Sequence, residues 1–98
     1  MSLQKDPEGR EKRILHQFVD FAGKQVLEIG CGDGRLTWKY AKSAGRVTGF
    51  DVEMDDLRLA RTDRPSDLEN QVSLTRASAC HIPFPRETFD IAILAWSL

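Results

Sequence analysis

The chain has 98 residues, 41% of them hydrophobic and 30% charged, and its formal net charge is −1 at pH 7. This length allows one domain at most, and the nearly balanced charge gives no electrostatic reason to expect a nucleic acid or a membrane surface as a partner. The polar amino terminus and the lack of an apolar run of about 18 residues argue against a secretory signal and a membrane span.

Cys31 and Cys80 are the only cysteines in the sequence. Two cysteines without the spacing of a metal site or a disulfide scaffold are typical of buried thiols in a reducing compartment. The sequence therefore predicts a cytoplasmic protein with no metal site in this chain.

The first predicted element is a helix that begins near Asp6-Pro7, because Asp is a favoured N-cap and Pro is favoured at the first helical position. Its apolar face consists of residues at helical spacing, namely Ile14, Leu15, Phe18, Val19 and Ala22. Gly23 stands where a glycine after the last turn would end this helix. We expect a leading helix ahead of the first strand.

An alternation of strands and helices occupies the rest of the chain. Predicted strands lie at residues 26–29, 47–51, 72–74 and 89–98, and predicted helices at 36–44, ended by Gly45, and at 54–64, ended before Pro65. Trp38 and Tyr40 are interpreted as packing residues of the first of these two helices. Strands separated by helices form a parallel sheet with right-handed crossovers, so the sequence predicts an α/β fold.

The segment VLEIGCGDG carries most of the functional information. A run of apolar residues, interrupted by Glu28, leads directly into glycines at alternate positions, Gly30, Gly32 and Gly34. Glycine adopts a positive φ at low cost and has no Cβ to keep a ligand away from the backbone. The segment therefore predicts a buried strand followed by a tight turn that lies against a cofactor.

Asp51 ends the second predicted strand, 21 residues after Gly30. In a doubly wound sheet this position faces the crevice beside the glycine turn, where a carboxylate can accept hydrogen bonds from both ribose hydroxyls of a nucleoside. The alternative is that Asp51 or Asp55 caps the following helix. Most of the other acids between residues 53 and 69 are expected to lie on a solvated helix face.

Four sequence motifs in order indicate a family. A dinucleotide-binding G-x-G-x-x-G pattern would need a glycine where Arg35 stands, which disfavours a nicotinamide-dependent oxidoreductase. The pattern present, E-x-G-x-G-x-G, resembles the first motif of the class I S-adenosylmethionine-dependent methyltransferases. VTGFDVEMDDL resembles the second motif of that family, and RASACHIPFPRETFDIAILAWSL resembles its third and fourth motifs. The resemblance extends from about Gln25 to Leu98.

The resemblance implies a Rossmann-like, doubly wound parallel sheet in the order 3-2-1-4, truncated after the fourth strand. Residues 1–98 would form a single partial methyltransferase domain, with residues 1–24 as the leading helix and residues 25–98 as the cofactor-binding half. The implied cofactor is S-adenosyl-L-methionine. The implied cofactor-binding residues are Glu28, Gly30, Gly32, Gly34, Asp51, Val52, Ser78, Ala79 and Ala95.

Each of these residues has an implied role. The glycines would let the backbone approach the methionine part of the cofactor, Glu28 would orient the amino group directly or through water, and Asp51 would hold the ribose. The remaining positions would lie near the adenine (Val52, Ser78, Ala79) or near the methionine part (Ala95).

Ser78 departs from the family pattern, because many relatives carry an aspartate there that bonds the adenine amino group. Cys80 and His81 occupy positions that vary in the family and are interpreted as loop residues. His16 is interpreted as a surface histidine.

The leading functional interpretation is methyl transfer from S-adenosylmethionine to a small-molecule acceptor, which the PF-x-x-x-x-FD pattern and the neutral charge favour. No residue can be named as a catalytic base. The alternatives are a cofactor-binding or regulatory half-domain without turnover of its own, and a structural fragment that binds nothing tightly. Because the family fold continues beyond its fourth strand, the apolar strand Ile91–Leu98 is expected to be an exposed edge through which the chain self-associates.

Overall fold

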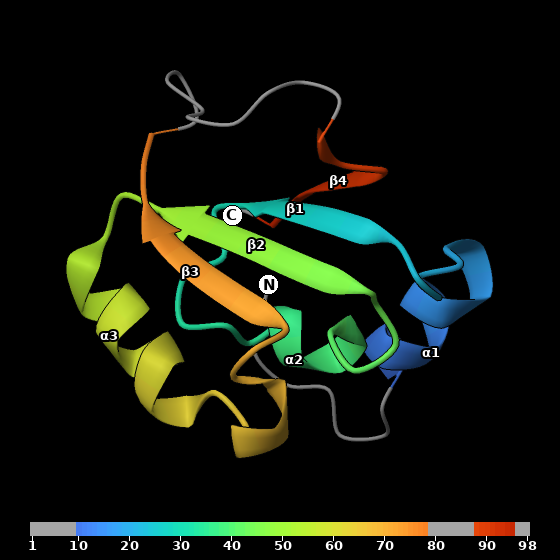
Figure 1. The fold of residues 1–98 in the computed structure, drawn as a ribbon, viewed down its shortest axis with the longest axis horizontal. Helices are drawn as coiled ribbons and strands as arrows, with labels where there is room; N and C mark the ends of the chain where they lie inside the picture. The colour runs from blue at the N-terminus through green and yellow to red at the C-terminus, as the bar shows by residue number, and fades with distance from the viewer. Residues whose placement is uncertain (1–9, 79–87, 96–98) are drawn as a thin grey trace.

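The computed structural model describes residues 10–78 and 88–95 of the chain (Figure 1). The elements follow in chain order: α1 (Arg10–Phe18), β1 (Gln25–Ile29), α2 (Thr37–Tyr40), β2 (Arg46–Asp51), α3 (Met54–Asp63), the 3₁₀ helix η1 (Ser66–Leu68), β3 (Val72–Arg76) and β4 (Ile91–Leu94). Within these residues no helix has the length and apolar character needed to cross a membrane.

The four strands form one parallel sheet in the order β3-β2-β1-β4, which confirms the predicted α/β fold and strand order. In this register Val26 of β1 lies opposite Val47 of β2 and Ile91 of β4. The chain passes from β1 outward through β2 to β3 and then returns to the other side of β1 for β4. The strand order therefore reverses at β1, which in open α/β sheets is where a ligand crevice forms.

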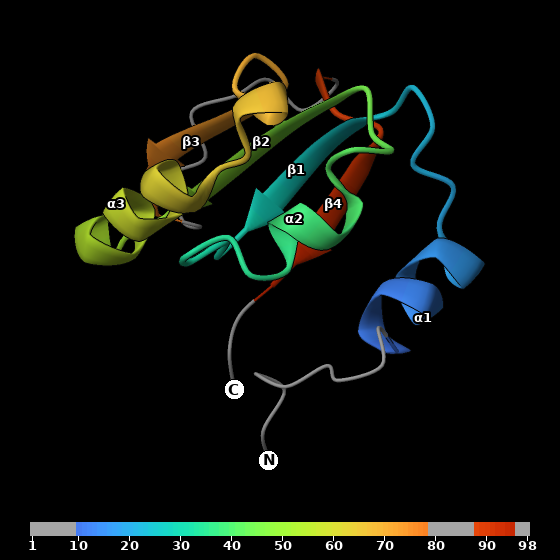
Figure 2. The same ribbon diagram turned by 90° about the horizontal axis from the view of Figure 1, so that it is seen from below.

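The core lies between the sheet and its helices. α1, α2 and α3 occupy the same face of the sheet (Figure 2). Val26, Val47 and Val72 lie side by side in register and are buried in one cluster with Leu57 and Ala60 of α3. Branched apolar side chains suit such strands, because they pack well on a pleated, buried surface.

The predicted first helix ends earlier than expected, and the prediction that Gly23 ends it is wrong, whereas its predicted start at Asp6-Pro7 lies outside the described residues. α1 ends at Phe18, and the side chain of Asp20 then accepts a hydrogen bond from the backbone N–H of Ala22 (3.1 Å). This turn carries Phe21 into the core, where its ring stacks on Tyr40 with ring centroids 4.7 Å apart. Burying a whole aromatic ring stabilises the chain more than one further helical turn would. Gly23 instead takes a positive φ in the turn before β1.

The predicted second helix is also shorter, because α2 has a single turn and gives way to turns after Tyr40. Gly45 does not have the positive φ of a glycine that ends a helix. A Cβ at Gly45 would lie 2.9 Å from the carbonyl group of Gly23, and the Gly45 N–H donates to the Lys24 carbonyl (2.9 Å). Close contact between two backbones therefore requires glycine at this position.

β4 forms one edge of the described sheet. Its side chains alternate between the packed face, where Ile91 and Ile93 contact the core, and the opposite face, where Ala92 is exposed and Leu94 is 64% exposed. The strand predicted at residues 89–98 is therefore shorter at both ends among the described residues, since β4 covers only Ile91–Leu94, and residues 96–98 lie outside the described residues.

Candidate cofactor site

The carboxyl ends of three strands meet at one edge of the sheet. Gly30 follows β1, Asp51 ends β2 and Ala95 follows β4. Backbone hydrogen bonds hold these ends together, from Gly30 N–H to the Phe50 carbonyl (2.9 Å) and from Ala95 N–H to the Ile29 carbonyl (2.8 Å). A group bound at this edge would contact residues that are far apart in the sequence.

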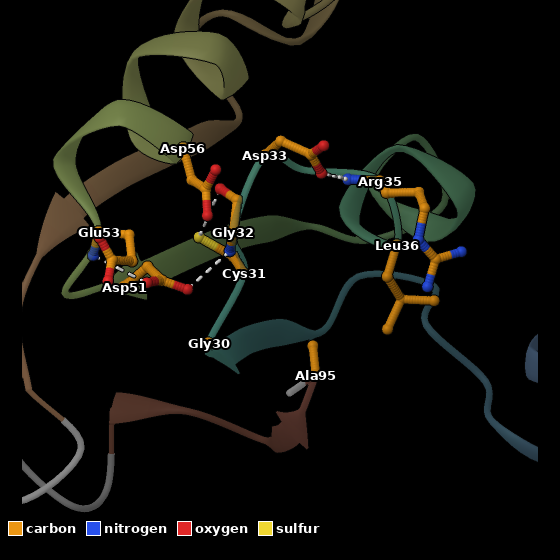
Figure 3. A pocket seen from close by; sticks show the side chains of 10 residues that line it. All are labelled: Gly30, Cys31, Gly32, Asp33, Arg35, Leu36, Asp51, Glu53, Asp56 and Ala95. Atoms are coloured by element: carbon orange, nitrogen blue, oxygen red, sulfur yellow. Dashed lines mark hydrogen bonds between the residues drawn. The ribbon is translucent and has the colours of Figure 1, made fainter. Parts of the chain in front are cut away.

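A hollow with a volume of about 360 Å³ opens at this edge (Figure 3). Its lining residues come from the glycine turn, the start of α2, the end of β2, the start of α3 and the end of β4. They are Gly30, Cys31, Gly32, Asp33, Arg35, Leu36, Asp51, Glu53, Asp56 and Ala95. The lining therefore includes four carboxylates and one guanidinium group, so it favours a ligand that carries positive charge.

The glycine turn has the backbone conformation that the sequence predicts. Gly30, Gly32 and Gly34 have φ angles of 78°, 56° and 88°, a region that residues with a Cβ rarely adopt. A Cβ built on Gly32 would meet no atom within 4 Å, so the backbone there borders open space. A Cβ on Gly34 would lie 2.6 Å from the indole ring of Trp38. Gly32 thus borders the hollow, whereas Gly34 makes room for a packed side chain.

Asp51 joins the glycine turn to the start of α3. Its Oδ2 accepts a hydrogen bond from Gly32 N–H (2.9 Å), and its Oδ1 accepts one from Glu53 N–H (2.9 Å). Glu53 itself is the N-cap residue of α3 and makes no side-chain capping bond. Each carboxylate oxygen can accept a further hydrogen bond. The Asp51 carboxylate is therefore held in place beside the hollow with acceptor capacity left for two hydroxyl groups.

Glu28 lies at the centre of a buried polar cluster beneath the glycine turn. The residue is 0% exposed, and its Oε1 accepts hydrogen bonds from Thr37 Oγ1 (2.8 Å) and the Tyr40 hydroxyl (2.5 Å). Its Oε2 is buried and has no hydrogen-bond partner among the described residues. Burial raises the pKa of Glu28 to about 7, although the two hydroxyl donors and the nearby Arg35 favour the ionised form.

The Cys31 thiol and the Tyr40 hydroxyl near this cluster stay neutral near pH 7. Burial and the neighbouring carboxylates of Glu28 and Asp51 raise the pKa of the Cys31 thiol to about 12. The pKa of the Tyr40 hydroxyl is raised by burial and by Glu28. The thiol is buried as expected from the sequence, and it lines the hollow as a neutral group.

The structure brings together part of the predicted cofactor-binding set at the hollow, namely Gly30, Gly32, Asp51 and Ala95. Val52 follows Asp51 with an exposed side chain, and its carbonyl accepts a hydrogen bond from Arg76 Nε (3.1 Å). Ser78 is half-buried two residues beyond β3. Ala79 lies outside the described residues, as do Cys80 and His81.

Asp56 is a lining residue that the sequence pattern does not predict. The pattern places it among the acids of a solvated helix face, but it is half-buried on α3 and lines the hollow together with Asp33 and Glu53. Its position in the first turn of α3, directly after the strand that ends at Asp51, could have indicated that it lies at the hollow. Helix starts at the carboxyl edge of a parallel sheet lie at the ligand crevice.

Trp38, Tyr40 and His16 lie outside the lining of the hollow. Trp38 and Tyr40 pack into the core, which confirms their interpretation as packing residues. His16 is exposed, and it contacts the edge of the Phe21 ring and lies 3.1 Å from the Lys39 carbonyl through Nε2.

The residues at the hollow fit an adenosyl sulfonium cofactor in three respects. Open space lies beside the Gly32 backbone, a fixed carboxylate with free acceptor capacity is bonded to that backbone, and a buried oxygen of Glu28 has no hydrogen-bond partner within residues 10–78 and 88–95. The ribose hydroxyls of such a cofactor can donate hydrogen bonds to the carboxylate. Its positive sulfonium and ammonium groups suit the acidic lining and the buried Glu28 oxygen.

Comparisons with known proteins agree with this geometry. A family model described as a methyltransferase domain matches residues 26–98. The chain is 38% identical over 79 residues to the methyltransferase GfsG of Streptomyces halstedii, covering 78% of this chain and 28% of that protein. It is 37% identical to a ubiquinone biosynthesis O-methyltransferase of Hydrogenovibrio crunogenus, with coverages of 80% and 32%. The crystal structure of a methyltransferase of Bacillus halodurans superposes with a TM-score of 0.76 at 26% identity, covering 88% and 38% of the two chains.

The fold and the site define an α/β protein with a nucleoside-type crevice at the reversal of its strand order. The chain belongs to the class I S-adenosylmethionine-dependent methyltransferases. It spans about a third of the length of the curated relatives it matches.

Proposed function

We propose that the chain binds S-adenosyl-L-methionine in the hollow and supplies the cofactor-binding part of a methyltransferase, with residues 1–24 as a leading segment and 25–98 as the cofactor-binding half. The observation that carries the proposal is the hydrogen bond from Gly32 N–H to Asp51 Oδ2. The bond joins a glycine backbone to a fixed carboxylate, and both residues line the same hollow.

Asp51 is the proposed ribose-binding residue, because its two oxygens are oriented by backbone donors and can each accept a hydroxyl group. Gly30 and Gly32 border the methionine part, and Ala95 closes the same end of the hollow from β4. Val52, Ser78 and Ala79 are proposed to lie along the adenine. Glu28 and Gly34 support the turn from beneath.

The chemistry supplied by the bound cofactor is a methyl group already activated on a positively charged sulfur. The protein's own task is therefore to orient the cofactor and to exclude water. The acidic lining favours the cationic cofactor electrostatically, and the glycine turn allows the backbone to contact it closely. We assign no catalytic base among the described residues.

The proposed methyl acceptor is a small molecule. Support comes from relatives named for quinones, such as the Hydrogenovibrio crunogenus ubiquinone biosynthesis O-methyltransferase and a demethylmenaquinone methyltransferase of Lactobacillus johnsonii that is 31% identical over 94 residues. The balanced charge of the chain also favours a small acceptor over a nucleic acid.

Calorimetric titration of the 98-residue chain with S-adenosylhomocysteine tests the proposal. One-site binding that Asp51→Ala weakens is the expected result. Lack of binding by a folded chain, or binding that is unchanged in Asp51→Ala, would show the proposal to be wrong.

Cofactor binding without turnover is the second candidate function. The coverage of only about a third of the relatives' length favours it for the 98-residue chain. A methyl-transfer assay run beside the titration separates the two candidates, because binding without product formation selects the second.

A further inference from the structure

The fully buried Glu28 carboxyl group is connected, through its neighbours in the chain and its hydrogen bond from Thr37, to residues that line the hollow. Gly30, two residues after Glu28, lines the hollow, and so do Arg35 and Leu36, which immediately precede α2. The first residue of α2 is Thr37, so the buried cluster of Glu28, Thr37 and Tyr40 is continuous with this wall.

The cluster is held rigidly. All three side chains are at most 1% exposed, and the Tyr40 ring is fixed by its stacking on Phe21. Both hydroxyl groups donate to the same oxygen, Oε1, which leaves Oε2 without a partner among the described residues. A buried oxygen in this state is costly unless it gains a proton or a donor from a ligand.

We propose that Thr37 and Tyr40 are positioning residues of the cofactor site, which hold the Glu28 carboxyl group so that it attracts the ammonium group of the bound cofactor, directly or through water. The proposal rests on the proposed function and adds to it two residues of α2 that do not line the hollow. A negative charge in such a buried setting acts over several ångströms, because the medium around it screens weakly.

The pH dependence of binding follows from the same arrangement. Because burial raises the pKa of Glu28 to about 7, the fraction of ionised carboxyl increases as the pH rises through this value, and the affinity for an ammonium group increases with it. The hydroxyl donors favour the ionised form, so the removal of either one moves the transition to higher pH.

Several other groups near Glu28 could contribute to a pH profile. On the packed face, Gly49 of β2 and Ile93 of β4 lie opposite Glu28 and carry no charge. Arg35 is a cation before α2, and Cys31 in the glycine turn stays neutral at these pH values.

Three further groups lie next to these residues. The Asp33 and Asp51 carboxylates of the lining raise the pKa of Cys31. His16 of α1 contacts the Phe21 ring that stacks on Tyr40. A His16→Asn variant therefore belongs in the experiment.

The test measures the affinity of two probes between about pH 5.5 and pH 8 for the wild type, Tyr40→Phe and Thr37→Val. S-adenosylhomocysteine carries the ammonium group, whereas 5′-methylthioadenosine retains adenine and ribose but lacks the amino-acid part. Thr37→Ser keeps a hydroxyl donor, and Tyr40→Phe keeps the ring that stacks on Phe21. Urea unfolding of each variant verifies that it is folded.

The expected result is an upward shift of about one pH unit in the affinity profile of S-adenosylhomocysteine for Tyr40→Phe and for Thr37→Val, which near pH 6 amounts to a loss of about tenfold relative to the wild type. Thr37→Ser and His16→Asn keep the wild-type profile. The affinity of 5′-methylthioadenosine stays unchanged in all variants.

An equal loss at every pH, or an equal loss for both probes, overturns the inference, because it indicates a merely structural role. If the wild type binds both probes and no variant shifts the profile, the inference is wrong and the proposed function stands. If a folded wild type binds neither probe, both are wrong.

Discussion

Gly32 and Asp51 are joined by a hydrogen bond of 2.9 Å from the backbone N–H of Gly32 to Oδ2 of Asp51. The bond connects the turn after β1 with the end of β2, so the geometry of the glycine turn and the orientation of the carboxylate depend on each other. A ligand that contacts Gly32 or Asp51 therefore binds to a residue whose conformation is already held by the other.

Asp51→Ala is expected to weaken the binding of S-adenosylhomocysteine by about 1.5–3 kcal/mol, which corresponds to about ten- to a hundredfold, because charge-assisted hydrogen bonds to the ribose are lost. Calorimetric titration measures the change. Asp55→Ala is a matched control, since this acid in the first turn of α3 has a side chain that is 93% exposed and pairs only with Arg58 among the contacts described (3.6 Å). Equal affinities of the wild type and Asp51→Ala would contradict the ribose-binding role.

Glu28→Gln is expected to change how stability depends on pH. The pKa of Glu28 is raised from 4.5 to about 7 in the folded chain, so the native state binds this proton more tightly than the unfolded state does. The resulting stabilisation, about 3 kcal/mol, is fully present below pH 4.5 and is lost as the pH rises through about 7. Glutamine cannot ionise, so the variant lacks this loss.

Urea unfolding at several pH values measures the effect as the difference in free energy of unfolding between variant and wild type. This difference removes the contribution of the other carboxylates. A difference that does not vary with pH between about 4.5 and 7.5 would show that folding does not raise the pKa of Glu28.

Gly34→Ala is expected to destabilise the fold by about 1–3 kcal/mol, because the new Cβ would lie 2.6 Å from the Trp38 indole and the overpacked turn must shift. Gly32→Ala shares the unfavourable positive φ but not the clash. Urea unfolding should therefore show a larger loss of stability for Gly34→Ala, and the smaller leucine side chain in Gly34→Ala/Trp38→Leu should recover part of it. Equal losses for the two single variants would argue against packing as the reason for Gly34.

Gly32→Ala is expected to impair cofactor binding more than folding. Its Cβ would extend into open space beside the backbone, where the cofactor is proposed to lie. We expect a loss of at least tenfold in affinity for S-adenosylhomocysteine in a calorimetric titration. Affinity within a factor of two of the wild type would place the cofactor elsewhere.

We propose that the 98-residue chain self-associates through the edge strand β4. Its outer edge pairs with no other strand among the described residues, and Leu94 is 64% exposed beside it. Unprotected edges of this kind pair with other chains. Sedimentation at tens of micromolar should show dimers or larger species for the wild type and a monomer for Leu94→Lys. A monomeric wild type would contradict this proposal.

The strands could be predicted from the sequence with good agreement in position. Runs such as Val26–Ile29 and Val47–Phe50 are apolar because parallel strands are buried, and burial leaves a direct pattern in the chain. The ends of α3 (Met54–Asp63) agree with the prediction of a helix that ends before Pro65, but the carboxyl ends of α1 and α2 could not be predicted in the same way. α1 ends early because Phe21 stacks on Tyr40, a residue 19 positions away, and no local pattern reports such a contact.

The site likewise has residues that a local sequence pattern predicts and residues whose place depends on long-range packing. The glycine turn and Asp51 could be named from spacing alone, whereas Asp56 was missed because the direction of its side chain depends on how α3 packs. The donors to Glu28 were missed for a related reason. A polar residue in an apolar strand needs partners, and Thr37 and Tyr40 lie at helical spacing, but only the rotation of α2 brings them to Oε1.

The order of strands and helices, the positive-φ turn after the first strand and the acid at the end of the second can all be read from the chain, because they follow from local burial patterns and from the conformational freedom of glycine. Which groups face each other depends on how the elements pack. The parallel register of β1 against β2 brings Gly32 to Asp51, and the packing of α2 on the sheet buries Glu28 with one oxygen hydrogen-bonded and the other without a partner in the described part of the chain. Such pairings depend on distances between segments that are remote in the chain, and these distances are set when the core packs.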